Sequence, residues 1–472
     1  MNLFKIAWRN LWRNRRRTAI TSASILFAVF FALIMRSFQL GFYDHMIRNV
    51  IESFSGFLQI QHIDYQDDPS LENTFPYSAE LQKTIESTPG ITAVVPRIET
   101  FALASTGNQT KGALIMGVDP VRERSLSNPE NLLVRYRITH EGIDRLNEDG
   151  GLPQPVHEKL KDILGNSYTN TGSIAMDLEL DEKEDSKILD AIASVSHFPG
   201  RYLENQDDGV LVSDRLAKYL RLTVGDTLIL MGQGYHGATA ADLYPVRGII
   251  KLINPELDNK IVYMNLPYAQ DFTGVGDKVT AVGINLADNS DKNMLAIQRS
   301  LAEKLNSDKI KVKNWKEFNP VLVQQIEGDN QSGKAFLALL YFVIFFGIFG
   351  TVLMMIHERH REFGMLVSIG MRKTKLALIM VIEMFLIGVL GVISGTVISL
   401  PLLYYFHIHP IRLTGGLAQT MEDMGFDPLM PLAWTESYVI WQGLIVALMV
   451  VLSCLYPLRK VLKLKETEAL RN

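Results

Sequence analysis

The sequence contains a single cysteine, Cys454, among its 472 residues. Intramolecular disulfides are therefore excluded, and any large domain has to be stabilised by its own apolar core. Acidic residues are absent from the first 18 positions, which carry one lysine and five arginines. Such an imbalance next to an apolar segment is typical of the cytoplasmic flank of a membrane helix.

Charged residues are also scarce in four long apolar runs. Each run approaches or exceeds the roughly 20 residues that a helix needs to cross about 30 Å of hydrocarbon. We therefore expect four transmembrane helices, at residues 19–40, 335–356, 376–406 and 438–456. The first run is longer than the apolar part of an ordinary signal peptide and no clear A-x-A site follows it, so we expect an uncleaved anchor.

The charge of the connecting segments predicts their side of the membrane. Residues 1–18, 357–375 and 457–472 together carry a net charge of +12, whereas residues 41–334 carry −13 and residues 407–437 carry −3. Short basic segments stay in the cytoplasm. We therefore expect both termini and the 357–375 connection on the inner side of a cytoplasmic (inner) membrane. The large region and the 407–437 loop are expected in the periplasm or outside the cell.

Residues 1–18 carry a second pattern. Phe4, Trp8 and Leu11/Trp12 fall on one helical face among arginines, which is typical of helices that lie in the membrane interface. The pattern predicts a cytoplasmic interfacial amphipathic helix at 1–18, ahead of the first span.

The region 41–334 has the mixed periodicity of an α+β domain. We expect one unit made of residues 41–118 and 278–314, with a second unit, residues 119–277, inserted in its middle. Ser78 is expected to cap the helix that follows it. The strand-like and helix-like segments are 55–63, 78–88, 91–95, 100–105, 111–118, 209–213, 214–220, 226–230, 278–286, 291–305 and 309–314.

Two stretches of the insert stand out. Residues 131–164 are of mixed charge and look helical. The run 177–185 holds six acids, which favours a solvated loop. A docking site for a basic partner and a divalent-cation site are the alternatives for this run.

The motifs of catalysis and nucleotide binding are incomplete. Residues 328–334, GDNQSGK, match the start of a phosphate-binding loop, but Ala335 stands where that motif has Ser or Thr. No strand precedes the segment, so we interpret it as a flexible polar entry to the second span. Two close histidine pairs have no carboxylate or cysteine in ligand spacing: His357 with His360, and His407 with His409. We expect no catalytic, metal, cofactor or ATP site on this chain, and no nucleic-acid partner.

Glu383 is an acid within the third run, about 12 Å from its start at 1.5 Å per residue. An intramembrane carboxylate is costly unless it faces protein or water. An interhelical hydrogen bond is the favoured interpretation, and a role in relaying motion or binding a polar substrate group is the alternative. Gly388, Gly391 and Gly395 follow on one face and would let another helix approach closely.

These residues resemble the FtsX/MacB-type ABC transporter permeases, which include the lipoprotein-releasing LolC and LolE branch. The segment 125–195 departs from the family, in which a shorter link is expected. Four stretches carry the resemblance: WRNL at 8–11 with 13–18; GRYL at 200–203, LA at 216–217 and VGD at 224–226; ER at 358–359, REFG at 361–364 and IG at 369–370 with Glu383; and PLR at 457–459 with EALR at 468–471.

The resemblance implies a four-span subunit that pairs with a second permease copy or a paralogue. It also implies a dimer of cytoplasmic ABC ATPases that binds the ATP and magnesium. In this family the connection between the second and third spans holds a coupling helix that sits in a groove of the ATPase. The residues expected to couple to the ATPase are Glu358, Arg359, Arg361, Glu362, Phe363, Gly364 and Gly370.

Together these inferences predict a permease that is not itself an enzyme. It would turn closure of its partner ATPase into motion of its outer domain. A lipoprotein, lipid or amphipathic peptide is the favoured cargo, because no span carries the several polar residues of an aqueous pore. A periplasmic carrier or lipoprotein is then a further partner. The alternative is a regulator that activates a periplasmic cell-wall hydrolase through the same lever.

Overall fold

The computed structural model describes residues 3–13, 15–148, 152–413, 417, 421, 429–434 and 436–462. The chain forms two compact units. The first comprises Met1–His45, Val321–Leu413 and Leu429–Asn472, and the second comprises Met46–Pro320 and Thr414–Pro428. The predicted cytoplasmic tail, 457–472, lies outside the described residues from position 463 onward.

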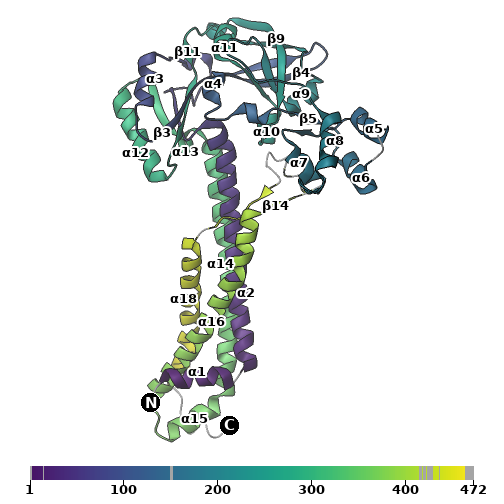
Figure 1. Ribbon diagram of the computed structural model, residues 1–472. Coiled ribbons are helices and arrows are strands. Elements are labelled where there is room, and N and C mark those ends of the chain that lie inside the picture. The colour runs from purple at the N-terminus through teal and green to yellow at the C-terminus, as the bar shows by residue number, and fades with distance from the viewer. Residues whose placement is uncertain are drawn as a thin grey trace. The chain divides into compact units, whose positions relative to one another are not determined.

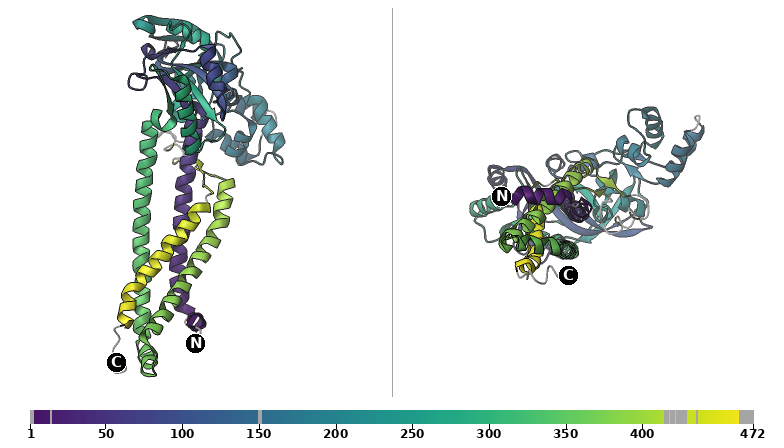
Figure 2. Two further views of the ribbon diagram at one scale, coloured as in Figure 1. Left: turned by 90° about the vertical axis from the view of Figure 1, so that its left-hand side faces the viewer. Right: turned by 90° about the horizontal axis from the view of Figure 1, so that it is seen from below.

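The first unit is a bundle of long helices, which Figure 1 and Figure 2 show from several sides. Among the described residues, three segments are long and apolar enough to cross a bilayer: Thr18–Glu52, Pro320–Glu358 and Lys373–Ile408. The fourth predicted span falls in α18, whose described apolar stretch Ile440–Ser453 is shorter than a full crossing. The elements are α1 (Leu3–Arg13), α2 (Arg15–Ile47), α14 (Pro320–Glu358), α15 (His360–Ser368), α16 (Lys373–Ile408), α18 (Glu436–Leu462), β14 (Ile411–Arg412) and β15 (Leu429–Met430).

Helix α14 has 39 residues, which correspond to about 58 Å of helix. It includes residues 328–334, where the Ser332 hydroxyl donates to the carbonyl of Gly328 at 3.0 Å. The interpretation of this segment as a flexible entry is therefore wrong. Once a helix has formed, each further residue adds one backbone hydrogen bond. Helix α14 can therefore continue through the polar residues 328–334. Because the helix uses these N–H groups, they cannot form the open nest that cradles a phosphate.

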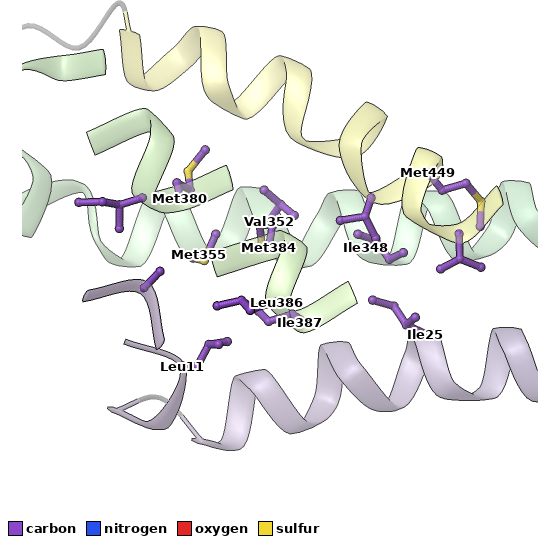
Figure 3. Packing of buried hydrophobic residues seen from close by; sticks show 14 of the residues in the cluster. Leu11, Ile25, Ile348, Val352, Met355, Met380, Met384, Leu386, Ile387 and Met449 are labelled. Atoms are coloured by element: carbon purple, nitrogen blue, oxygen red, sulfur yellow. The ribbon is translucent and has the colours of Figure 1, made fainter. Parts of the chain in front are cut away.

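The bundle packs around one apolar cluster, to which each of the six helices described for this unit contributes. Figure 3 shows part of it, with Leu11 from α1, Ile25 from α2, Ile348, Val352 and Met355 from α14, Met380, Met384, Leu386 and Ile387 from α16, and Met449 from α18.

Glycines of α16 set how closely its neighbours approach. A Cβ placed on Gly391 would lie 2.6 Å from Cβ of Ile25, and one on Gly395 would lie 2.8 Å from the carbonyl oxygen of Leu26. Both neighbours belong to α2. On the other side, a Cβ on Gly388 would lie 3.1 Å from Cγ2 of Val450 in α18. The small face of α16 thus allows close contact with α2, and a side chain at Gly391 would force the two helices apart.

The second unit is built on a nine-stranded sheet of order β13-β1-β12-β3-β4-β10-β7-β9-β8. Strand β8 also pairs with β3. The part of the sheet with the order β3-β4-β10-β7-β9-β8 therefore closes into a barrel. Alternate residues point inward from each strand and form the barrel's apolar core. The strands are β1 (Leu58–His62), β3 (Ile91–Ser105), β4 (Thr110–Val118), β7 (Val210–Ser213), β8 (Thr227–Gln233), β9 (Thr239–Ile250), β10 (Ile261–Asn265), β12 (Ala281–Leu286) and β13 (Ile310–Asn314).

Helices and minor elements complete this unit. The predicted helix 291–305 coincides with α12, and Ser78 caps α3 by accepting a hydrogen bond from the backbone N–H of Leu81 at 3.2 Å. The elements are α3 (Ala79–Glu86), α4 (Pro120–Glu123), α9 (Asp214–Leu220), α10 (Pro255–Asp258), α11 (Leu266–Thr273), α12 (Asp291–Leu305), α13 (Trp315–Phe318), the π-helix Arg48–Ser55, the short 3-10 helices Leu71–Asn73, Pro129–Leu132 and Tyr235–Gly237, and the pair β2 (Phe75–Pro76) with β11 (Lys278–Val279).

Two expectations for this unit need correction. The segments 91–95 and 100–105 are parts of one 15-residue strand, β3, and not two strands. Residues 119–277 do not form a separate sheet, because β10 pairs in parallel with β4 and brings β7, β9 and β8 into the same sheet. Parallel pairing needs a long crossover, and the residues between β4 and β10 supply it.

The part of the insert that stands apart from the sheet is a small helical lobe with its own apolar core. The helix-like stretch 131–164 includes, among its described residues, the helices His140–Glu148 and Gln154–Asp162 and the short strand Tyr136–Arg137. In the acidic run, Asp181 accepts hydrogen bonds from the backbone N–H groups of Lys183 and Glu184, as in a capped, solvated turn. The lobe comprises β5 (Tyr136–Arg137), α5 (His140–Glu148), α6 (Gln154–Asp162), β6 (Ser167–Tyr168), α7 (Thr171–Asp177) and α8 (Ser186–Ser196).

Candidate functional site

The connection between α14 and α16 contains the short helix α15, which has one buried and one exposed face. Phe363, Gly364 and Val367 are buried in the bundle core. Arg361 and Met365 point to the surface one turn apart. This two-sided character explains why so short a helix is stable: burial of its apolar side compensates for the low stability of an isolated nine-residue helix.

Backbone geometry at both ends separates α15 from the long helices α14 and α16. At Arg359 the chain leaves the α14 helix with φ −99° and ψ 8°. After α15 the chain turns at Gly370, whose φ of +98° is in the region that favours glycine. There the N–H of Met371 donates to the carbonyl of Leu366 at 3.0 Å, and Ile369 next to it is 84% exposed. The loop therefore presents an apolar residue to its surroundings at the end of α15.

A chain of ion pairs joins α15 to two other helices. The Arg359 guanidinium donates from Nη1 to Oε2 of Glu383 in α16 at 2.8 Å, and from Nε to Oε2 of Glu362 in α15 at 3.1 Å. Arg13 at the end of α1 donates to the same oxygen of Glu362 at 2.7 Å. The sequence Arg13, Glu362, Arg359, Glu383 thus alternates in charge and links α1, α15 and α16.

Burial increases steadily along this chain of charges. The side chains of Arg13 and Glu362 are 59% and 42% exposed, whereas those of Arg359 and Glu383 are 10% and 1% exposed. The outer pair is therefore weak and screened by salt, and the inner pair is held in a medium of low dielectric constant. A carboxylate and a guanidinium buried together neutralise each other, which makes Glu383 compatible with its place in an apolar helix.

The Glu362 carboxylate is stabilised in its charged form. Partial burial raises its pKa, but the hydrogen bond from Arg359 and the charges of Arg13 and Arg359 outweigh that effect and bring the pKa below its usual value. Glu362 is therefore anionic at neutral pH and stays available to both arginines.

The structure divides six of the seven residues expected to couple to an ATPase into two groups, and the seventh, Glu362, lies between them with 42% of its side chain exposed. Glu358, Arg361 and Gly370 are exposed. Arg359, Phe363 and Gly364 are buried inside the bundle and do not offer a surface to a partner. These residues stabilise the position of α15 in the bundle. The Arg359 guanidinium carbon also lies 5.2 Å from the centroid of the Phe363 ring.

Sequence reasoning missed three residues of this site: Arg13, Met365 and Ile369. The spacing of Arg361, Met365 and Ile369 at four-residue intervals is a helical-face signal that could have identified the last two. No local signal indicates that Arg13 pairs with Glu362, because the two positions are 349 residues apart.

Comparison with protein families places this site within a known domain. Residues 334–465, which include α15, α16 and the Arg359–Glu383 pair, match the family model "FtsX-like permease C-terminal". The chain is 21% identical over 280 residues to the lipoprotein-releasing system transmembrane protein LolC of Xylella fastidiosa, and 24% identical over 290 residues to an uncharacterized ABC transporter permease of Methanocaldococcus jannaschii. Each alignment covers 58% of this chain and 65% of the relative, so less than two thirds of each relative's length is matched.

Two solved structures resemble this chain more distantly. The periplasmic region of MacB from Actinobacillus actinomycetemcomitans aligns at 11% identity with a TM-score of 0.30, covering 60% of this chain and 95% of that one. The extracellular domain of the noncanonic ABC-type transporter YknZ from Gram-positive bacteria aligns at 11% identity with a TM-score of 0.28, covering 54% and 99%. Residues 334–465 thus match the FtsX-like permease domain, and the chain is similar over more than half of its length to ABC transporter permeases that include LolC.

Proposed function

We propose that this permease converts ATP hydrolysis by a separate cytoplasmic ATPase into movement of its large α+β unit, and that it extracts or exports a lipoprotein, lipid or amphipathic peptide. The observation that carries the proposal is the construction of α15. Its outer face, with Arg361, Met365 and Ile369, is open to a partner, while Arg359 behind it is paired with Glu383 in α16. A force on the outer face would therefore be delivered to a long apolar helix.

The proposed path of the force runs through contacts that resist deformation. Breaking a buried ion pair is costly, so α15 and the lower part of α16 would move together. Gly391 and Gly395 pack α16 directly on α2, which carries the movement to a second helix. Helix α14, which precedes the site without a break, is about 58 Å long and supplies a rigid lever.

The proposed topology has four spans, with both termini and α15 on the cytoplasmic side of the inner membrane. The charge distribution of the sequence supports this orientation. As the fourth span we propose α18, which has 27 residues and packs against Gly388 of α16 through Val450. The subunit would pair with a second permease copy or a paralogue, and two ATPase subunits would bind the ATP and magnesium.

The coupling part of the proposal can be tested with changes to the exposed face of α15. Arg361→Glu combined with Ile369→Asp should abolish capture of ABC ATPase subunits when the tagged permease is purified from its own membranes. Lys311→Glu, an exposed charge reversal in the large unit, is the matched control and should retain them. Retention of the ATPase by the α15 variant would contradict the proposal. Glu362 is unsuitable for this test because its reversal breaks internal ion pairs.

The cargo part of the proposal needs a separate measurement. Lipid-modified proteins or lipids should accumulate on the purified complex when ATP hydrolysis is blocked, and ATP should release them. Recovery of a soluble cell-wall hydrolase bound to the large unit, without such cargo, would contradict the transport assignment and favour a regulator.

A further inference from the structure

Helix α1 has an exposed aromatic stripe that the coupling proposal does not use. Ala7 and Leu11 face the bundle and are buried. Phe4, Trp8 and Trp12, which are four residues apart, remain exposed, and the two indole rings contact each other edge to face at 6.2 Å between centroids. The sequence placed these four residues on one helical face. In the structure, Leu11 packs against the bundle, whereas the three aromatic rings are exposed.

The same helix carries only positive charge. Lys5, Arg9 and Arg13 are exposed, and no acid occurs in the first 18 residues. One residue after α1, the chain enters α2, whose candidate membrane segment starts at Thr18. A helix joined so closely to a membrane span, with exposed indoles and cations, matches the surface of a bilayer that contains anionic lipids.

Arg13 connects this surface to the coupling site. Its guanidinium donates to Glu362 of α15, but 59% of its side chain is exposed. A guanidinium binds phosphate with the same two-pronged geometry that it uses for a carboxylate. A lipid phosphate beside α1 can therefore compete with Glu362, and Glu362 keeps Arg359 as its second partner at 3.1 Å when Arg13 leaves.

We infer that α1 binds the headgroup phosphates of anionic phospholipids, and that Arg13 exchanges between a headgroup and Glu362. Anionic lipid then loosens the hold of α1 on α15, whereas phosphatidylcholine leaves that hold intact because its own choline ammonium compensates the charge of its phosphate. The effect of this exchange on transport rests on the proposed function. The lipid binding and the exchange themselves do not depend on an ATPase, so they can be tested without one.

The first test measures lipid retention by the full chain in mixed phosphatidylcholine and phosphatidylglycerol. Changing Lys5, Arg9 and Arg13 to glutamine should reduce the phosphatidylglycerol that remains bound after purification severalfold. The matched control changes three exposed lysines of the large unit, Lys292, Lys309 and Lys311, to glutamine and should have no such effect. Equal retention by both variants would overturn the inference.

The second test follows the exchange directly and uses single changes that preserve the rest of α1. Glu362→Gln removes the competing carboxylate and should increase phosphatidylglycerol retention, whereas Arg13→Gln should decrease it. Spin labels at Asn10 and Met365, in a Cys454→Ser background, should report a longer or broader distance in nanodiscs with phosphatidylglycerol than in phosphatidylcholine alone. In Arg13→Gln the two lipid mixtures should give the same distribution. A distribution that does not respond to lipid in the chain with Arg13 would refute the exchange.

Discussion

Replacing Glu383 by glutamine removes the anion that faces Arg359 inside the bundle. The two groups are 2.8 Å apart, and their side chains are 1% and 10% exposed. Glutamine keeps the size of the side chain and can still accept a hydrogen bond. The change therefore isolates the charge and leaves the packing of α16 nearly intact.

The expected cost follows from the burial of the guanidinium that remains. Breaking a buried ion pair by removing one partner costs about 3–5 kcal/mol, because an uncompensated charge is left in the interior. Arg359 retains Glu362 as a second partner at 3.1 Å, so we expect the free energy of unfolding to fall by about 3 kcal/mol, the lower end of this range. Arg359→Met with Glu383→Met removes both charges together, and its free energy of unfolding should lie within about 1 kcal/mol of the starting protein.

The measurement is a double-mutant cycle of Arg359→Met, Glu383→Met and the two together, with Glu383→Gln beside it, on the full chain in detergent, with unfolding followed by denaturant titration. The single changes should each be strongly destabilising, and the double change should recover most of the loss. The double variant also distinguishes the role of the ion pair in stability from its role in coupling. Although it should be stable and should still capture the ATPase, its transport response should be smaller, because α15 is no longer tied to α16. Additive single effects, or a Glu383→Gln variant as stable as the original chain, would refute the argument that this pair holds α15.

Three further changes test other parts of the structure. Gly391→Ala should destabilise the bundle because its Cβ would lie 2.6 Å from Cβ of Ile25, whereas Gly347→Ala, with no atom within 4 Å, should be neutral or slightly stabilising; thermal unfolding distinguishes them. Burial raises the pKa of Asp258 to about 6 from 3.8, so the folded state binds its proton more tightly than the unfolded state. The stability that this proton provides is fully present below about pH 4 and is lost as pH rises through about 6, by up to about 3 kcal/mol. Hydrogen exchange of the large unit should show this loss, and Asp258→Asn should remove it. Ser78→Ala should cost the large unit about 1 kcal/mol through loss of the cap, without affecting the bundle.

The elements that could be predicted are those whose signal is local. Helix α12 coincides with its predicted range, because the spacing of its apolar residues Met294, Ile297 and Leu301 lies within the segment itself. The three described spans lie where the apolar runs lie, because a bilayer crossing depends on length and composition alone. The division of the large unit was less predictable, since strand pairing between β4 and β10 joins positions more than 140 residues apart.

The candidate site shows the same limit. The resemblance placed Arg359, Arg361 and Glu362 in one coupling motif. Among the ion pairs described, Arg359 and Glu362 take part in pairs within the bundle, whereas Arg361 takes part in none and is exposed. The orientation of each side chain depends on the angle at which α15 leaves α14, which is set by packing against α1 and α16. No periodicity within nine residues contains that information.

The sequence by itself predicted membrane spans, the side of the membrane that the basic segments favour and a short connection at 357–375, because charge and hydropathy can be read along the chain without a fold. The tertiary structure decided which residues of that connection are buried and which are available. It paired Arg359 with Glu383 and Glu362 with Arg13, since these contacts form only when the faces of three separate helices meet. The absence of acid from the first 18 residues, visible at once in the sequence, acquires a physical consequence only when α1 is seen to end against α15.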